Sequence, residues 1–238
     1  MTFKDLQKLT TTIQKNNSIK PSEFDKLKGL PFWIWNQSEH KRIDSKTKGK
    51  CCFNHIIGLP KDNKTGKENR LFDYQELVYN ILQNHRRLWI LKATGLGISE
   101  FFLRYMACLC LRDDIYRNSQ FVIVTGPNWD LSKKLIRRMK QLFETKLDIY
   151  FDSKDTLLYL NGVTIESFPS HYVDSFRSLN NPKFLFMDEF DFFLKGQQEE
   201  TRAVAERYIA KSNPYIILVS TPNMPEGLMQ TIEQEPEE

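Results

Sequence analysis

The sequence predicts an α/β domain in which a central, mainly parallel sheet is flanked by helices. Short apolar runs alternate with longer helical patterns, a glycine-containing loop joins one run to a helix, and another run ends in two acids. Strands that alternate with helices form right-handed crossovers, which cover a parallel sheet on both faces. With 238 residues, of which 40% are hydrophobic and 13% aromatic, the chain can bury a core of this kind.

The first elements are expected from residue 71 onward. A helix begins within residues 71–75, where polar and aromatic residues mix. The run 87–92 is short and apolar, as a buried strand would be, and residues 98–112 form a longer apolar stretch with helical spacing. Residues 121–125 predict the next strand, which Gly126-Pro127 stops.

The second half continues this alternation. Residues 130–146 are amphipathic, and Asp130 is the expected N-cap of their helix. Asn161-Gly162 predicts a two-residue hairpin between strands at 156–160 and 163–168. Apolar runs predict two further buried strands, separated by a helix at 197–211; the runs are 184–187 and 215–219.

The chain is expected to have three parts: an irregular basic extension at 1–70, a core at 71–225 and an acidic tail or linker at 226–238. Residues 1–70 carry 15 Lys/Arg against 7 Asp/Glu, whereas the last 13 residues carry five glutamates. Short helices are expected near 3–15 and 22–28, and the aromatic segment Phe32-Trp33-Ile34-Trp35 must be buried. The densest basic run, residues 41–50, has two interpretations, contact with a phosphate backbone or a solvated loop.

Composition also excludes several classes of protein. No stretch approaches the ~18 apolar residues of a membrane-spanning helix, and the N-terminus lacks the apolar region of a secretion signal. We therefore expect a cytoplasmic protein that does not contact a membrane. The cysteines form two close pairs, Cys51/Cys52 and Cys108/Cys110, which favours reduced thiols. Cys51, Cys52 and His55 fall short of four metal ligands, so a core role is expected, and His40, His85 and His171 show no partner pattern.

The segment 91–100 indicates a phosphate-binding loop between a strand and a helix. Compared with G-x-x-x-x-G-K-[S/T], Gly97 matches the second glycine and Ser99 the hydroxyl. Ile98 takes the usual lysine position, and Lys92 takes that of the first glycine. A lysine there can reach back across the loop to the terminal phosphates of ATP. The amides expected to surround the phosphate oxygens belong to Thr94, Gly95, Leu96, Gly97, Ile98 and Ser99.

Three further segments complete the predicted site. Asp188 and Glu189 follow a buried strand, where Asp188 would hold Mg²⁺ together with Ser99, and Glu189 would polarise the attacking water. Gln75 has an amide that can pair with an adenine edge, and its neighbour Tyr74 offers a stacking face. Hydroxyls of Ser220 and Thr221 end the last strand, next to where the terminal phosphate would lie.

This ordered set resembles the ATPase domain of the large terminase subunit, the DNA-packaging motor of tailed viruses. The resemblance covers about residues 71–223 and rests on Tyr74-Gln75, the segments 92–99 and 184–189, and Ser220-Thr221-Pro222-Asn223. It implies a P-loop NTPase fold of the ASCE/RecA-like group, ATP and Mg²⁺ as cofactors, and a displaced phosphate-loop lysine. It also implies double-stranded DNA as partner, a homo-oligomeric ring, and contact with portal and small terminase subunits.

The resemblance further implies a role for Arg177 as an arginine finger that acts on a neighbouring subunit. The family often has Arg-Gly where this chain has Arg177-Ser178. Terminases generally continue into a nuclease domain, but few residues follow Asn223, so the acids of this chain are not assigned to DNA cleavage.

Two other functions remain open. The chain could be a helicase-like or remodelling ATPase on nucleic acid. Alternatively, Ile98 at the usual lysine position suggests a nucleotide-binding module without turnover.

Overall fold

The computed structural model describes residues 26–62, 64–147, 151, 154–223, 225 and 227–233. A six-stranded sheet has the order β1-β6-β5-β2-β4-β3, and every neighbouring pair is parallel except β3 with β4. The strands are β1 (Arg87–Leu91), β2 (Gln120–Thr125), β3 (Leu157–Leu160), β4 (Val163–Pro169), β5 (Pro182–Asp188) and β6 (Tyr215–Ser220). The predicted fold class, a mainly parallel sheet flanked by helices, is confirmed.

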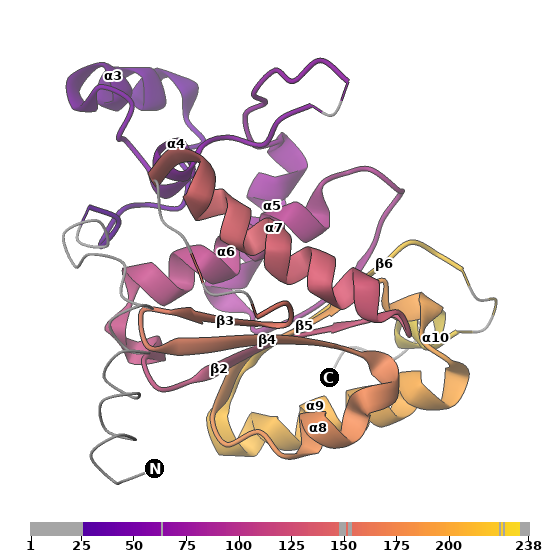
Figure 1. Cartoon of the computed structure of the whole chain (residues 1–238). Helices are drawn as coiled ribbons and strands as arrows, with labels where there is room; N and C mark the ends of the chain where they lie inside the picture. Colours follow the sequence, from indigo (N-terminus) through magenta and orange to yellow (C-terminus); the bar gives the residue numbers. More distant parts are fainter. Residues whose placement is uncertain are drawn as a thin grey trace, which may run out of the picture.

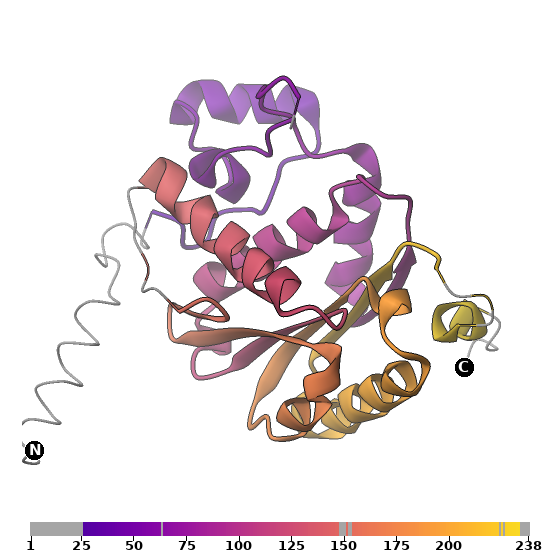
Figure 2. The same ribbon diagram turned by 45° about the vertical axis from the view of Figure 1, so that its right-hand side comes forward.

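Helices cover both faces of this sheet (Figures 1 and 2). On one face lie α5 (Asp73–Asn84), α6 (Ile98–Arg112) and α7 (Trp129–Leu147), with α3 (Gln37–Thr47) and α4 (Phe53–Ile57) beyond them. The other face carries α8 (Val173–Arg177) and α9 (Lys195–Ser212). Short α10 (Leu228–Glu233) packs against α9, and the 3₁₀ turns are η1 (Asp114–Tyr116), η2 (Ser170–Tyr172) and η3 (Phe190–Phe192).

Alternating side chains of the strands divide the core into two clusters. In β2, Phe121 and Ile123 join the cluster beneath α6 and α7, whereas Val122 and Val124 join that beneath α8 and α9. This is the two-residue period of a strand buried on both faces. The two clusters pack the helices against the sheet. The carboxyl ends of its parallel strands lie together at one edge of the sheet, and the candidate site lies at that edge.

Phe102 tests the packing of the first cluster. Its ring is fully buried in α6 and lies 5.1 Å from the ring of Phe186 on β5. Phe102→Ala is expected to lower the free energy of unfolding by about 3–5 kcal/mol, because the lost ring leaves a cavity. Urea denaturation measures the loss, and Leu77→Ala, at a 63% exposed position of α5, is the control expected to change little.

Several expectations need correction. One interpretation of the basic run 41–50, a solvated loop, is wrong, because most of the run lies in α3, whose N-cap is Asn36; contact with a phosphate backbone stays a prediction. The strand at 87–92 was expected to be buried, but β1 is a partly exposed edge strand. Asp130 is not the cap of α7, because Asn128 Oδ1 accepts the Asp130 N–H at 2.8 Å.

Of the remaining expectations, some are confirmed and others fall wholly or partly outside the described residues. The hairpin is confirmed, since Asn161 and Gly162 both have positive φ, 49° and 77°. Phe32 and Trp33 are buried as expected. The helix expected at 3–15 lies outside the described residues, and of the helix expected at 22–28 the described residues, 26–28, form a turn. Among the helices of the described part, none combines the length and hydropathy needed to cross a membrane.

Candidate functional site

A glycine loop joins β1 to α6 at the carboxyl edge of the sheet. Gly95 and Gly97 have φ of +85° and +69°, conformations that residues with a Cβ rarely adopt. Gly97 is the N-cap of α6, so the first turn of a 15-residue helix begins at the loop. The loop therefore offers backbone amides and the positive end of the helix dipole to an anion.

Lys92 points across this edge to the acidic strand. Its Nζ lies 3.0 Å from Glu189 Oε1 and 3.5 Å from Thr221 Oγ1, and its side chain is 7% exposed. Glu189 Oε2 in turn accepts the backbone N–H of Thr221 at 3.3 Å. The displaced lysine thus faces the acidic pair, and in this structure it is paired with the predicted general base.

The strand order explains why Lys92, Thr221 and Glu189 lie in contact. β6 lies between β1 and β5, so Thr221, just beyond β6, lies between Lys92 and Glu189. Ser220 is fully buried, and its Oγ accepts the Asp191 N–H at 2.9 Å. Ser220 therefore anchors the turn that follows the acids, whereas Thr221 borders the site.

Ser99 and Asp188 form the second link across the site. The Ser99 hydroxyl donates to Asp188 Oδ1 at 2.8 Å, and Asp188 is 3% exposed. Burial raises the pKa of the Asp188 carboxyl to about 6, although the Ser99 hydrogen bond opposes the shift. A hydroxyl and a carboxylate are hard oxygen ligands, so the pair has the donor chemistry that Mg²⁺ prefers.

Glu189 has an unusual backbone. Its φ and ψ are 54° and 49°, in the left-handed region, where a residue other than glycine is strained. The chain turns there from β5 into η3, and the turn directs the Glu189 carboxylate back toward Lys92 and Thr221.

Tyr74 and Gln75 hold the loop from the side of α5. The Tyr74 hydroxyl donates to the carbonyl of Leu96, and Gln75 Nε2 donates to that of Gly97 at 3.4 Å. Gln75 Oε1 accepts the Phe72 N–H at 3.0 Å, and the residue is 3% exposed. In this arrangement the Gln75 amide supports the phosphate loop, and recognition of adenine by Gln75 stays a prediction.

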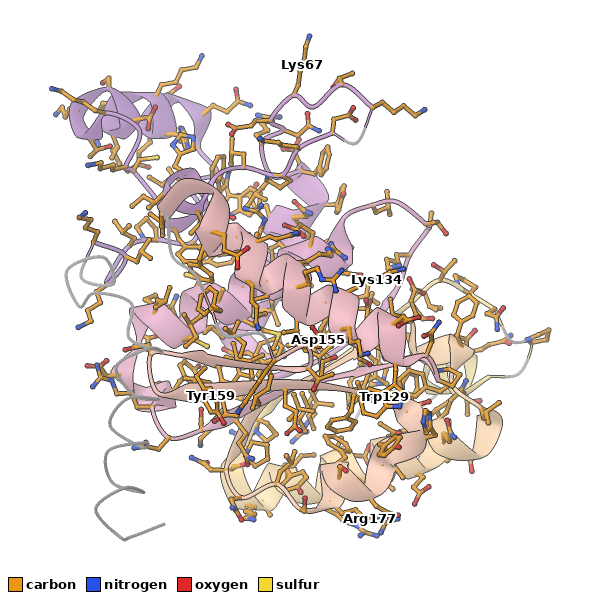
Figure 3. All side chains as sticks on the ribbon, in the orientation of Figure 1. Lys67, Trp129, Lys134, Asp155, Tyr159 and Arg177 are labelled. Carbon is orange, nitrogen blue, oxygen red and sulfur yellow. The ribbon has the colours of Figure 1, made fainter. Side chains whose placement is uncertain are left out.

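The remaining predicted residues occupy different positions. Ile98 is buried in the core, so the usual lysine position serves packing here, while Thr94 and Leu96 are exposed on the loop. Arg177 ends α8, and its guanidinium contacts Asp174, with 3.4 Å from Nε to Oδ1, and Glu200 of α9. Figure 3 shows Arg177 on the side of the sheet covered by α8 and α9. Its action on a neighbouring subunit stays a prediction.

A charged cluster that the sequence analysis missed lines a cavity beside the loop. Glu100 Oε1 lies 2.8 Å from Arg104 Nε, and its Oε2 lies 2.8 Å from Arg138 Nη2 of α7. Burial raises the pKa of Glu100, but the two guanidinium groups outweigh burial and lower it. The i,i+4 spacing of Glu100 and Arg104 signals their pair, whereas nothing in the sequence places Arg138 beside them.

This cavity has a volume of about 730 Å³, which is large enough for a nucleotide. It connects the loop glycines Gly95 and Gly97 with the segments 57–62 and 68–72. The lining of a second cavity, of about 310 Å³, includes Thr94 of the loop, Glu189 and Thr221. The larger cavity therefore borders the loop glycines, and the smaller one borders the predicted general base, Glu189.

Comparison with known proteins supports the fold. No family model matches the chain, and neither does any curated protein. Among solved structures, the HK97 bacteriophage large terminase is similar, with 14% identity, a TM-score of 0.57, and 75% of this chain and 39% of that chain covered. The Thermus phage P74-26 large terminase ATPase domain matches with 12% identity and a TM-score of 0.46 over 71% of this chain and 72% of that one.

A third similar structure is S. cerevisiae Dbp5, with 16% identity and a TM-score of 0.49 over 70% of this chain and 46% of that one. At these identities, the similarity to the HK97 protein is one of fold. The chain spans 39% of the length of that terminase. The predicted resemblance to terminase ATPase domains is therefore confirmed for the fold, a P-loop NTPase fold.

Proposed function

We propose that this chain is an Mg²⁺-dependent ATPase that drives the translocation of double-stranded DNA, as a motor that packages viral DNA. One observation carries the proposal: Lys92 and Ser99 of the loop meet Glu189 and Asp188 at the end of β5. A cation, a hydroxyl and two carboxylates around a helix N-terminus are the groups that phosphoryl transfer to water requires. The terminase fold supports the choice of DNA as substrate.

In this proposal, the ion pair of Lys92 and Glu189 belongs to the resting state of the enzyme, before ATP binds. While Lys92 Nζ lies 3.0 Å from Glu189 Oε1, that carboxylate oxygen is occupied by the ammonium group. Terminal phosphate oxygens over the loop would compete for Lys92, and Glu189 would then be free to accept a proton from water. Thr221 touches both groups and could sense this exchange, which fits a coupling role for the segment 220–223.

Bound Mg²⁺ would neutralise charge that develops on the phosphates. Ser99 and Asp188 would hold it. Their oxygens are already 2.8 Å apart, so little reorganisation of the protein is needed. Because burial favours the protonated form of Asp188, a cation there would also offset the cost of the ionised carboxylate.

Several parts of the proposal concern partners. Lysines and arginines of 1–70 offer positive charge for a DNA backbone, including Lys41, Arg42 and Lys46 on α3. A ring of identical subunits would let Arg177 act in trans, and its ion pairs on the surface with Asp174 and Glu200 would have to open. Portal and small terminase subunits are the proposed partners in packaging.

ATP hydrolysis by the wild type and by Lys92→Ala tests the site. We expect Mg²⁺-dependent hydrolysis that double-stranded DNA stimulates, and a loss of at least about 10²-fold in the variant, because the transition-state charge loses its cation. Lys183→Ala, on β5, is the matched control. Equal rates in Lys92→Ala and wild type would refute the catalytic assignment, and ATP binding without hydrolysis would favour a module without turnover.

The DNA substrate needs a separate assay. Displacement of a third strand from a triplex reports translocation along a duplex, whereas separation of a duplex reports helicase activity. We expect ATP-dependent triplex displacement without strand separation. The opposite result would replace the packaging motor with a helicase-like or remodelling ATPase and leave the site assignment intact.

A further inference from the structure

Four side chains with metal-binding atoms converge in the N-terminal part of the chain, apart from the nucleotide site. They are His40 on α3, Cys51 and Cys52 between the helices, and His55 on α4. One ligand atom from each lies within 4.8 Å of all the others. Cys51, Cys52 and His55 alone were too few to predict a metal site, and nothing in the sequence places His40 beside them.

The spacing of these atoms fits a tetrahedral ion. Cys51 Sγ lies 3.6 Å from Cys52 Sγ, 3.5 Å from His40 Nε2 and 3.1 Å from His55 Nδ1. Zinc bonds to sulfur and nitrogen, arranged at tetrahedral angles, separate two sulfurs by about 3.8 Å and a sulfur from a nitrogen by about 3.6 Å. The four groups are thus close to the positions of a closed Cys₂His₂ site and need only small shifts.

The surroundings fit a structural site. Both cysteines are buried, and the Trp33 ring packs against both imidazoles, with centroids 4.6 Å from His40 and 5.4 Å from His55. Asp44 Oδ1 lies 3.0 Å from His55 Nδ1, and this contact would have to open, because a ring nitrogen that binds zinc carries no proton to donate. Thiolate and imidazole ligands enclosed in this way select zinc over hard cations.

Helix α3 supplies a second, independent argument. All of its residues are described and none is buried; half-buried Ile43 is its one apolar side chain, and that side chain packs against the core. It has a cap at Asn36, but a surface helix of 11 residues is marginal without tertiary contacts. A cross-link from His40 to Cys51, Cys52 and His55 would strengthen this limited attachment.

We propose that His40, Cys51, Cys52 and His55 bind one Zn²⁺ ion, which fastens the basic helix α3 to α4. The consequence reaches the larger cavity. Gly58, directly after α4, accepts Arg104 Nη1 at 2.6 Å through its carbonyl, and Ile57 and Gly58 line that cavity. The ion would tie α3 to the segment that lines this cavity, whatever reaction the site performs.

Metal content of the full-length protein tests the proposal. After purification without a histidine tag, elemental analysis is expected to give one zinc per chain. Exchange for Co²⁺ is expected to give the visible bands of a tetrahedral ion and a thiolate-to-cobalt charge-transfer band. The charge-transfer band requires cysteine ligands, so it distinguishes the cluster from metal bound elsewhere on the surface.

Paired variants locate the ion. Cys51→Ala with Cys52→Ala is expected to lose the zinc and the cobalt spectrum, whereas Cys108→Ala with Cys110→Ala, which alters the other buried pair, retains both. His40→Ala is expected to weaken zinc binding at least about tenfold and to speed proteolysis between α3 and α4. If the double variant of Cys51 and Cys52 fails to fold, the spectrum of the wild type and His40→Ala decide the question.

Clear results would overturn the proposal. The first is a wild type that binds no stoichiometric zinc or cobalt after incubation with the metal. The second is a cobalt spectrum that persists without Cys51 and Cys52. The third is a protein mass lower by two hydrogens, which marks a disulfide between the adjacent cysteines. ATP hydrolysis enters none of these measurements, so the zinc site and the proposed function can fail separately.

Discussion

Replacing Glu189 by glutamine is expected to slow ATP hydrolysis by about 10²- to 10⁴-fold, the usual contribution of a general base. The amide keeps the size of the side chain and can still accept the Thr221 N–H, but it cannot take a proton from water. The change also removes the ion pair with Lys92, so that Lys92 is released for the phosphates. ATP affinity should therefore be unchanged or higher while turnover falls.

Single-turnover hydrolysis and equilibrium binding of ATP measure the two effects separately. Glu206→Gln makes the same chemical change on α9, where the carboxylate pairs with Arg202, and is expected to leave both unchanged. A Glu189→Gln enzyme that hydrolyses ATP at the rate of the wild type would remove Glu189 from the reaction. Loss of binding together with turnover would instead indicate that the ion pair supports the loop.

The parts of this structure that could be predicted are those whose cause is local. Helix α6 has the predicted bounds because a run of apolar residues follows Gly97 directly, and the hairpin at Asn161-Gly162 follows from two residues that tolerate positive φ. The site could be placed because parallel strands end at one edge, which brings the loop after β1 to the acids after β5. Predicting that the loop and the acids lie together required neither the order of the strands nor their register.

Contacts between segments that are distant in the sequence could not be predicted from it. Helix α3 has no apolar period because it buries none of its residues, so its basic sequence gave no sign of a helix. His40 lies 11 residues before Cys51, and the turn that unites them leaves no pattern in the sequence. The same holds for Arg138, which meets Glu100 only because α7 crosses α6, and for Gln75, whose amide is engaged by the backbone of the loop.

Asp188→Asn is expected to stabilise the protein without nucleotide while abolishing Mg²⁺-dependent hydrolysis. The pKa of Asp188 is about 6 in the folded protein, against an ordinary value of 3.8. Below about pH 4 the carboxyl is protonated in both states and costs nothing; the cost grows as pH rises and is complete above about pH 6. At pH 7 it is about 3 kcal/mol. Asparagine is neutral and keeps an oxygen for the Ser99 hydroxyl, so it avoids this cost.

Urea denaturation without Mg²⁺ or nucleotide, at pH 7 and at pH 5, measures the effect. The variant should gain up to about 3 kcal/mol at pH 7 and less at pH 5, because wild-type Asp188 is then mostly protonated. Asp155→Asn, at an exposed position, should show no such difference. A variant no more stable than wild type at pH 7, or a gain equal at both pH values, would contradict the ionised, buried carboxylate. The ionised Asp188 carboxylate lowers the free energy of unfolding of the protein without metal. A bound cation would restore it, as expected for a metal ligand at this position.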